Sequence, residues 1–351
     1  MNVGIIYHEN CLKHRPGGRH PERPERLQSI VSNLESISSK FKSVSWFTPP
    51  KGQLDHVLLV HTKEHIDKIK FKEELGGDYA DDLDTIVNQG TLEAALYAVG
   101  ASIHAGNLVL KQEVKHAIAL IRPPGHHATV DKALGFCIFN NIAILAKWLL
   151  KRGLKHIAII DWDAHHGNGT QDIFYDTSNV LYVGLHQDGR TLYPGTGSIN
   201  EIGQGNGLGY TINIPFPPRA SEKHYIFAFK KIILPYLNLY QPDIMLVSAG
   251  YDAHYLDNIS DLFLTAQSYW RFSKMLMDAF PDVSIILLLE GGYNLQALSR
   301  SVANTVLALD GQPLAFKDNL PPFDDKIINR YMTSLIKKIR KILDPYWRKK
   351  Q

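Results

Sequence analysis

The residues best suited to chemistry lie in one short run, Asp161 to Gly169, with the sequence DWDAHHGNG. This run directly follows His156–Ile160, an apolar segment typical of a buried parallel strand. In open α/β sheets, ligands bind outside the carboxyl ends of such strands. Asp163 and His165 are two residues apart, so in an extended backbone both side chains project from the same side and can bind one ion. Carboxylate and imidazole ligands indicate a catalytic divalent metal of the zinc kind, since structural zinc favours thiolates.

A second strand-like segment, AIALI, runs into RPPGHH and ends at two adjacent histidines, His126 and His127. One imidazole can take a proton from an attacking water while its neighbour adjusts the local charge, because the ordinary pKa of histidine suits such work. The alternatives are a pair of metal ligands or a surface pair. The nearby carboxylates and imidazoles favour a catalytic role.

Two more apolar segments end in residues of the same kinds. DIMLV leads to Asp252, which would complete a set of two aspartates and one histidine and leave a fourth metal position for water and substrate. IILLL leads into EGGYN, where the glycines give the backbone freedom to turn Tyr293 inward. Its hydroxyl could donate to a developing oxyanion, although a packing tyrosine is the alternative.

Elements that position these residues alternate along the chain. Helical patterns cover Thr91–Leu110, Asn140–Leu150, Ser221–Tyr240 and Thr265–Ala279. Strand, helix and strand in alternation predict an α/β fold with a mostly parallel sheet and helices on both faces. The predicted strands are Val3–Tyr7, Ala117–Ile121, Ile157–Ile160, Val180–Leu185, Ile244–Val247 and Ile285–Leu289.

Composition limits the classes of protein. The 351 residues are 44% hydrophobic and 21% charged, as in an ordinary globular chain. With 38 basic and 35 acidic residues, charge gives no reason to expect direct nucleic-acid or membrane binding. Only Cys11 and Cys137 occur, which predicts a reducing, cytoplasmic location. There is neither a signal-peptide pattern nor an apolar run of membrane-spanning length. Because candidate residues from His126 to Tyr293 must meet in one site, one large domain is expected.

Two segments have a second interpretation. Pro194–Gly209 is rich in glycine, but it lacks the Gly-Lys-Ser/Thr ending of a phosphate loop, so we expect a flexible loop near the site mouth. In Lys326–Ile342, apolar residues three or four apart alternate with basic ones. Such a helix could bind an acidic partner or a membrane, and docking on its own domain with the lysines in water is favoured.

Taken together, these motifs resemble the zinc-dependent histone deacetylase superfamily, which includes class II and bacterial histone deacetylase-like amidohydrolases. The resemblance extends from HPERPERL, beginning at His20, through RPPGHHA, GFC, DWDAHHGNG, LHQDG, YPGTG and AGYDAH to EGGYN. It implies the arginase/deacetylase fold, with a mostly parallel eight-stranded sheet. A single deacetylase domain over residues 1–320 is expected, followed by a C-terminal basic amphipathic helix over 321–351 packed on it.

The resemblance also assigns roles. It implies that Asp163, His165 and Asp252 bind Zn²⁺, one per chain, with Fe²⁺ or Co²⁺ possible in its place and K⁺ possible nearby. His127 falls on the general base and His126 on its electrostatic partner. The remaining catalytic and supporting positions are Asp161, which holds His126; Tyr293, which stabilises the oxyanion; Asn168, beside His127; and Arg26, near the acetate exit.

Five positions fall on the substrate channel of the family. Gly135 and Phe136 match one wall and Tyr193 another, Asp84 matches a carboxylate at the rim that holds the substrate backbone, and Ile259 lies in the gatekeeper region. A glutamate at the gate selects polyamines in one class II enzyme, so the apolar Ile259 favours acyl-lysine. Asn168, where class I members carry aspartate, is similar to the class II and bacterial pattern.

The expected function is zinc-dependent hydrolysis of an acetyl amide, with acetyl-lysine on a protein or peptide as substrate and acetate and a free amine as products. Acetylpolyamine hydrolysis is the main alternative, and a catalytically silent acyl-lysine binder is a further one. A ureohydrolase with two manganese ions would need a carboxylate at the end of a DAHxD run, where this chain has Gly167. The sequence gives no oligomeric state.

Overall fold

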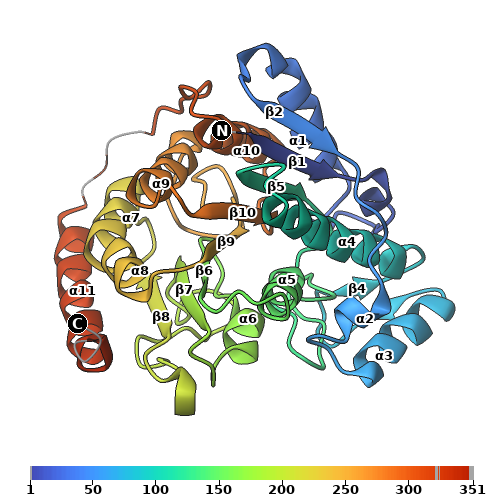
Figure 1. Ribbon diagram of the computed structural model, residues 1–351, viewed down its shortest axis with the longest axis horizontal. Helices are drawn as coiled ribbons and strands as arrows, with labels where there is room; N and C mark the ends of the chain where they lie inside the picture. Colours follow the sequence, from blue (N-terminus) through green and yellow to red (C-terminus); the bar gives the residue numbers. More distant parts are fainter. Residues whose placement is uncertain (1, 321–322, 324, 348–351) are drawn as a thin grey trace.

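The computed structural model describes residues 2–320, 323 and 325–347. Its centre is one eight-stranded sheet in which all neighbouring strands are parallel, so the predicted α/β fold is confirmed (Figure 1). Parallel strands need both faces covered, which explains why six of them read as continuous apolar runs. In spatial order the strands are β2 (Val44–Phe47), β1 (Val3–Tyr7), β5 (His116–Leu120), β10 (Ser284–Leu289), β9 (Ile244–Ala249), β6 (Ile157–Asp161), β7 (Val180–Gln187) and β8 (Thr211–Phe216).

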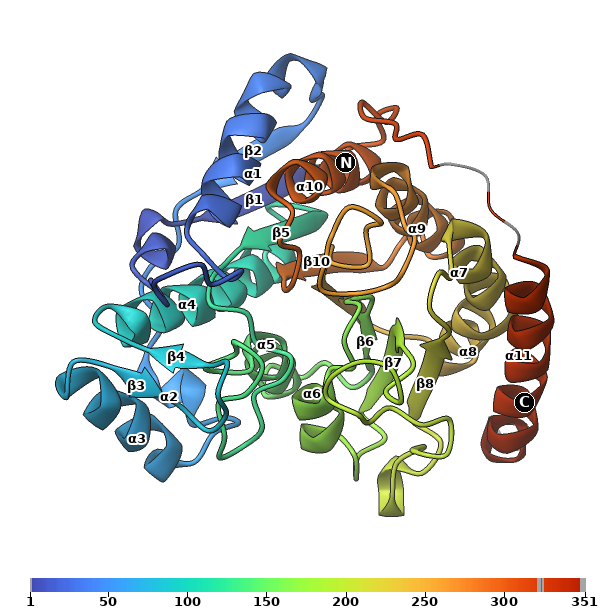
Figure 2. The same cartoon turned by 180° about the vertical axis from the view of Figure 1, so that it is seen from behind.

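Helices cover the sheet on both faces (Figure 2). One layer holds α1 (Glu25–Ser36), α10 (Leu295–Leu309), α9 (Ala266–Ala279), α7 (Glu222–Ala228) and α8 (Leu234–Tyr240), and the other holds α4 (Thr91–Leu110), α5 (Asn141–Leu150) and α6 (Asn168–Ile173). Between β2 and α4 the chain forms α2 (Leu54–Val57), α3 (Lys63–Glu74) and a short antiparallel pair, β3 (Asp78–Tyr79) and β4 (Ile86–Val87).

The two outer strands of the sheet were missed from the sequence for physical reasons. Strand β8 contains Pro215, which cannot donate a ladder hydrogen bond. This proline is tolerated because β8 is an edge strand. Strand β2 has four residues and no fully buried position, so it lacks the apolar run of an inner strand. The burial signal on which sequence patterns depend is therefore weak in β2, whereas β8 is fully buried and its pattern is interrupted by the proline.

The helix predicted over Ser221–Tyr240 needs a correction. The structure divides it into α7 and α8, separated by a π-helical turn at Phe229–Ile233. Pro235 lies at the start of α8. Proline lacks the N–H that would bond to the carbonyl four residues earlier, and its ring clashes with that carbonyl, so the helix widens by one residue before it.

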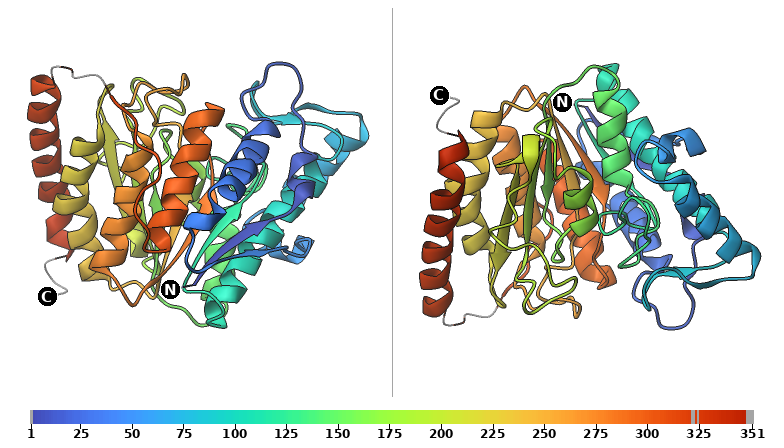
Figure 3. Two further views of the ribbon diagram at one scale, coloured as in Figure 1. Left: turned by 90° about the horizontal axis from the view of Figure 1, so that it is seen from above. Right: turned by 90° about the horizontal axis from the view of Figure 1, so that it is seen from below.

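Helix α11 (Lys326–Trp347) lies at the opposite end of the molecule from β2, alongside the gold helices α7 and α8 (Figure 3). It contacts α7 and β8. Lys337 and Lys338 are exposed, as are the other cations of its outer face. Of the apolar positions expected to face inward, Ile328 and Ile342 are only partly buried. The buried residues are Met332, Leu335, Ile336, Ile339, Leu343 and Trp347.

Among the described residues, no helix is both long and apolar enough to cross a membrane.

Trp347 explains why α11 extends five residues past the predicted end. Its ring is buried and its indole N–H donates to the carbonyl of Gly209 at 2.9 Å. This contact attaches the last turn of the helix to the loop before β8. The helix begins at Lys326 and not at residue 321, and residues 321–322, 324 and 348–351 of the predicted segment lie outside the described residues.

A buried charge network joins the start of α1 to the end of β5. Glu22 is fully buried and accepts hydrogen bonds from Arg122 at 2.5 and 2.6 Å and from Arg26 at 3.1 Å. His14 lies 3.4 Å from the same carboxylate, and burial lowers its pKa to about 4. Its ring is therefore neutral near pH 7, which leaves one carboxylate between two guanidinium groups.

We predict that Glu22→Gln lowers the free energy of unfolding by about 3 to 5 kcal/mol at pH 7, because it leaves two buried guanidinium groups without a charge partner. Burial raises the pKa of Glu22, but Arg122 and its other partners outweigh burial and hold this pKa at about 2, below 4.5. A carboxyl group of this kind stabilises the fold above its unfolded pKa, and the contribution is lost as the pH falls through the folded value. In urea unfolding, the difference between wild type and variant should therefore shrink between pH 4.5 and about 2.

Glu93→Gln is the matched control. Glu93 pairs with Lys13 at 2.9 Å, but its side chain is 34% exposed. Removing a pair of this kind should change the free energy of unfolding by less than about 1 kcal/mol. A loss in Glu22→Gln that stays constant from neutral to acid pH would contradict the assignment of its stability to the carboxylate.

Candidate active site

The DWDAHHGNG run turns sharply at the carboxyl end of β6. Asp161 is the last residue of that strand and pairs with Gly184 of β7 and Ser248 of β9. Its carboxylate accepts the backbone N–H of Asp163 at 3.2 Å, and Asp163 in turn accepts the N–H of His165 at 2.9 Å. Each aspartate thus fixes the backbone two residues further along. This is why the turn holds its side chains in one orientation.

The three predicted metal-ligating residues, Asp163, His165 and Asp252, meet at the base of the site. His165 Nδ1 lies 2.8 Å from Asp252 Oδ2 and 3.2 Å from Asp163 Oδ1. One ligand atom from each of the three residues lies within 4.8 Å of the others. Both aspartates are buried, and the side chain of His165 is 11% exposed.

The charges of this trio fit a bound cation. Burial and the neighbouring Asp163 raise the pKa of Asp252 to about 7. Burial opposes ionisation of Asp163 as well, but His126 and the hydrogen bond from His165 hold its pKa below the ordinary value. Two carboxylates this close in a dry environment repel each other, and a positive ion between them relieves the repulsion.

Two glycines leave the space that these carboxylates occupy. A Cβ at Gly250 would lie 2.0 Å from Asp163 Oδ2, and one at Gly291 would lie 2.7 Å from an oxygen of each aspartate. The N–H of Gly291 also donates to Asp163 Oδ2 at 2.8 Å. The strand ends β9 and β10 therefore form a backbone cradle around the ligand atoms, which only glycine permits.

No carboxylate of a second metal site can be built at Gly167. A Cβ there would lie 2.1 Å from Asp161 Oδ2, because the aspartate fills that space. This observation supports the one-ion interpretation of the DAHHG run.

The two adjacent histidines have different partners. His126 Nδ1 lies 3.0 Å from Asp161 Oδ2. Burial lowers the pKa of His126, but the charges of Asp161 and Asp163 outweigh burial and raise this pKa to about 10. His126 is therefore an imidazolium near pH 7 and donates its Nδ1–H to Asp161.

His127 is held in the opposite state. Burial, followed by the charges of His126 and His165, lowers its pKa well below the ordinary value. Its Nδ1 lies 2.7 Å from Asn168 Oδ1. The amide oxygen can only accept, so Nδ1 carries the proton and Nε2 presents a free lone pair. A neutral imidazole with a free lone pair can act as a base.

Tyr293 reaches the site from the turn after β10. Its backbone N–H donates to Asp257 Oδ2 at 2.6 Å, and the guanidinium of Arg26 stacks over its ring at 4.9 Å. Arg26 is itself fixed, since its Nε donates to the carbonyl of Gly292 at 2.6 Å. Burial raises the pKa of Tyr293, so the hydroxyl remains a neutral donor.

These groups open into one pocket of about 220 Å³. All five predicted substrate positions line it, together with four other predicted site residues: His126, His127, His165 and Tyr293. The remaining predicted residues are not part of the lining; they are Asp161, Asp163, Asp252, Asn168 and Arg26. Phe136 meets Tyr293 edge to face at 5.8 Å between ring centroids. The lining residues are Asp84, Pro124, His126, His127, Gly135, Phe136, His165, Leu192, Tyr193, Ile259, Gly291 and Tyr293.

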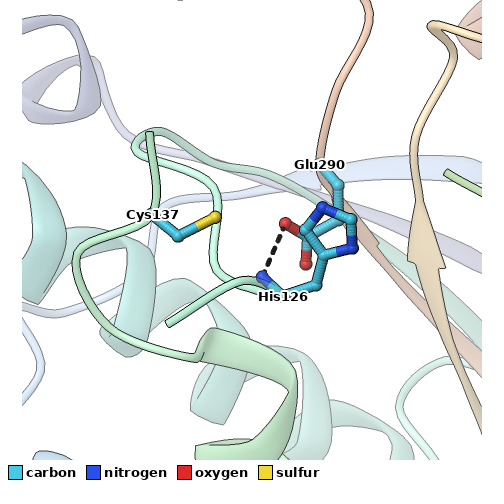
Figure 4. A group of neighbouring side chains, drawn as sticks. All are labelled: His126, Cys137 and Glu290. Atoms are coloured by element: carbon cyan, nitrogen blue, oxygen red, sulfur yellow. Dashed lines mark hydrogen bonds between the residues drawn. The ribbon is translucent and has the colours of Figure 1, made fainter. Parts of the chain in front are cut away.

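A second group could in principle hold a metal: His126, Cys137 and Glu290, with ligand atoms within 4.8 Å of one another (Figure 4). Glu290 Oε2 already accepts the backbone N–H groups of Gly125 at 2.7 Å and His126 at 3.2 Å. Burial raises the pKa of the Cys137 thiol well above its ordinary value. A protonated thiol is a poor ligand, so we interpret this group as a support for the turn before the histidines.

Sequence patterns missed several residues that support the pocket. Asp257 accepts hydrogen bonds from the backbone of Tyr293 and Asn294, and Leu192 and Pro124 line the pocket. Gln187 bonds to the loop that follows β7 and to the loop that follows β9. Arg122 carried a usable signal, because a charge at the end of an apolar strand needs a buried partner. The others could not be found from spacing, since their partners lie far away in the chain.

Comparison with known proteins identifies the class. The fold and the residues gathered in this pocket are those of a hydrolase that acts on amides. Residues 20–309 match the histone deacetylase domain. The chain therefore belongs to the histone deacetylase family. Members are generally metal-dependent, and the residues able to hold an ion are present.

Individual relatives agree with this assignment. The chain is 41% identical over 320 residues to a probable deacetylase of Archaeoglobus fulgidus, covering 90% of this chain and 88% of that protein. It is 37% identical over 313 residues to histone deacetylase 15 of Arabidopsis thaliana, covering 88% of this chain but 55% of the plant protein. The crystal structure of the HDA15 HD domain superposes with a TM-score of 0.90 at 32% identity, covering 99% of this chain and 97% of that one.

We predict that Gly250→Ala reduces bound divalent metal from about one ion per chain to less than half an ion per chain. The new Cβ occupies the position of Asp163 Oδ2, so either the carboxylate or the end of β9 must move. Elemental analysis of the purified protein after dialysis measures the content. Gly17→Ala is the control and should keep its metal, because a Cβ there meets no atom within 4 Å. Its left-handed backbone, with φ of 85°, costs the alanine about 1 kcal/mol of stability but does not touch the ligand atoms. Full metal content in Gly250→Ala would show that the cradle is not required.

Proposed function

We propose that this protein hydrolyses the acetyl amide of an acetyl-lysine side chain on a protein or peptide. The reaction uses one divalent metal ion, for which Zn²⁺ is the first candidate. The observation that carries the proposal is one pocket lined by His126, His127, His165 and Tyr293, with carboxylate oxygens of Asp163 and Asp252 within 4.8 Å of a ring nitrogen of His165. The two adjacent histidines of this pocket have pKa values shifted in opposite directions. Its walls include Phe136, Leu192 and Ile259, which suit the apolar stem of a lysine.

Asp163, His165 and Asp252 would hold the ion. Two carboxylates and one imidazole suit Zn²⁺ and also accept Fe²⁺ or Co²⁺, so availability decides occupancy. When bound, the ion polarises the acetyl carbonyl and makes the attacking water more acidic. We also propose that K⁺ binds near the backbone of the Asp161 turn, as the family resemblance implies.

The protein's own groups then handle the protons. His127 takes a proton from the attacking water at Nε2, since Asn168 fixes the other proton on Nδ1. The proton subsequently goes to the amine leaving group, which departs as the free amine with acetate as the second product. His126, kept charged by Asp161, adds positive charge next to the developing oxyanion.

Tyr293 is proposed to donate its hydroxyl to the same oxyanion. Arg26 and Asp257 hold the ring and the backbone of this residue, so the hydroxyl is positioned before substrate arrives. A donor that is already in place needs no reorganisation during the reaction. Asp84, at the pocket rim, is proposed to accept the backbone N–H of the substrate, and Arg26 to lie beside the path of acetate release.

Acetylpolyamine hydrolysis is the second candidate, and one observation favours it. The negative charges of Asp82 and Asp84 act on Tyr193 at the pocket wall and, after burial, contribute to its raised pKa. A cationic polyamine would be attracted by this charge. Ile259 offers no carboxylate at the gatekeeper position, which supports acetyl-lysine instead.

We retain two further proposals from the sequence. Residues 1–320 form the catalytic domain, with the C-terminal helix packed on it, and the protein acts in the cytoplasm. A silent binder of acyl-lysine would need the same pocket without turnover. Histidines held in opposite protonation states argue for turnover, because binding alone requires no base at His127.

Tyr293→Phe is expected to lower kcat on an acetyl-lysine peptide by about 10² to 10³, the usual effect of losing one oxyanion donor. KM and metal content should stay within about twofold, because the ring and the ligand trio remain. Steady-state kinetics and elemental analysis measure both.

Tyr193→Phe is the matched control. Tyr193 lies in the same pocket, but its side chain forms a wall, and the residue is 43% exposed. Removing its hydroxyl should leave kcat within a few-fold of wild type. If the two variants lose equal activity, Tyr293 is not the oxyanion donor. If wild type binds the peptide without turnover, the silent binder is correct.

Turnover on an acetyl-lysine peptide is expected to exceed turnover on acetylspermidine by at least about tenfold in kcat/KM, equivalent to about 1.4 kcal/mol. The apolar Ile259 gives the polyamine no charge partner. Both substrates are assayed by acetate release with the same zinc-loaded enzyme. Equal or better polyamine turnover would replace the first candidate with the second.

A further inference from the structure

The pocket has walls from two loops that are distant in the chain. Leu192 and Tyr193 come from the loop that follows β7, whereas Ile259 comes from the loop that follows β9. Both loops lie near the surface, and Tyr193 is 43% exposed. Loops of this kind keep a fixed separation only if something joins them.

Gln187, the last residue of β7, makes that connection. Its side chain is buried, and the residue is 1% exposed. Its Oε1 accepts the backbone N–H of Asp261 at 2.8 Å, while its Nε2 donates to Thr191 Oγ1 at 3.1 Å and to Asp261 Oδ2 at 3.2 Å. The side-chain amide of Gln187 therefore bonds to both loops, through Thr191 on one and Asp261 on the other.

Thr191 directly precedes Leu192, and Asp261 is two residues after Ile259. Thr191 also donates through its hydroxyl to the carbonyl of Asp188 at 2.8 Å, which closes the turn that leads to Tyr193. On the other loop, the carbonyl of Asp261 accepts the N–H of Arg219 at 2.6 Å. A shift at either end of the amide would thus be passed to the adjacent wall through a short, hydrogen-bonded stretch.

The other end of Gln187 is fixed to the metal-ligating turn. Its backbone N–H donates to the carbonyl of Ala164, between Asp163 and His165, at 2.8 Å. The loop after β9 is likewise fixed, since Ser260 Oγ donates to the carbonyl of Asp252 at 2.7 Å. Both walls are therefore hydrogen-bonded to the base of the site, and the side chain of Gln187 connects one wall to the other.

We propose that Gln187 is a specificity-determining positioning residue, which fixes the separation of the Leu192–Tyr193 wall from the Ile259 wall. It thereby sets the width of the acyl-lysine side chain that the pocket accepts. The proposal rests on the proposed function, since it names what the same pocket selects. Gln187 itself does not line the pocket, so it acts through its neighbours.

The test is Gln187→Met, which keeps the length of the side chain and removes its hydrogen bonds. Looser walls hold the lysine stem less well in both the ground state and the transition state. KM for an acetyl-lysine peptide should therefore rise about fivefold to tenfold, the equivalent of one or two lost hydrogen bonds, with kcat within about twofold. The kcat/KM ratio of an isobutyryl-lysine to an acetyl-lysine peptide should increase, because the pocket admits a wider group.

Gln267→Met is the matched control. Gln267 also joins two segments through its amide, accepting the N–H of Asp318 at 2.9 Å and donating to its carbonyl at 3.1 Å, but it lies outside the pocket. It should leave KM and the acyl ratio unchanged. Thr191→Val, which removes one of the Gln187 contacts, should give a smaller effect in the same direction as Gln187→Met.

The outcomes separate this inference from the proposed function. If wild type turns over the acetyl-lysine peptide and Gln187→Met behaves like Gln267→Met, the inference is overturned and the proposed function stands. If wild type turns over only acetylspermidine, the proposed substrate fails, and KM for acetylspermidine is compared in the same variants. Backbone hydrogen exchange over 188–197 and 257–264 is measured in each case. Exchange that is no faster in Gln187→Met than in wild type also overturns the inference.

Discussion

Carboxylates gathered in a dry place impose the main constraint on this structure. Asp161, Asp163, Asp252 and Glu290 are all buried at the carboxyl ends of β6, β9 and β10. Burial disfavours each negative charge unless hydrogen bonds or positive charges compensate for it. The neighbouring residues follow from this requirement. His126 is kept charged beside Asp161, and backbone N–H groups donate to Asp163 and Glu290. The carboxylates of Asp163 and Asp252 beside His165 carry negative charge that a bound cation would balance.

The same requirement explains why the two histidines differ although they are adjacent in the chain. His126 faces two carboxylates and becomes a cation. That cation, together with burial, keeps His127 neutral, and the amide of Asn168 supplies direction without charge. The division of labour therefore needs no difference in residue type. It arises because Nδ1 of His126 meets a carboxylate, whereas Nδ1 of His127 meets an amide oxygen.

A second buried charge group supports the site from behind. Glu22 joins Arg122, which precedes the turn of the histidines, to Arg26, which stacks on Tyr293. Sequence patterns gave the type of most central elements, because the six inner strands are short continuous apolar runs and helix α4 is a long apolar segment rich in alanine and leucine. They missed β2, which is short and partly exposed, and β8 and the break at Pro235, where a proline interrupts the pattern.

The sequence by itself determined which residue types stand at each strand end, and parallel strands place such ends at one edge of a sheet. The Asp, His, Asp trio, the two histidines and Tyr293 could therefore be named from the linear order. Only the tertiary structure decided which nitrogen of His127 is free, that Asp161 fills the space beside Gly167, and that Gln187 lies between the two wall loops. Local patterns record burial and turn chemistry, whereas contacts between side chains of different loops, such as Gln187 with Asp261, depend on how the strands are ordered in the sheet.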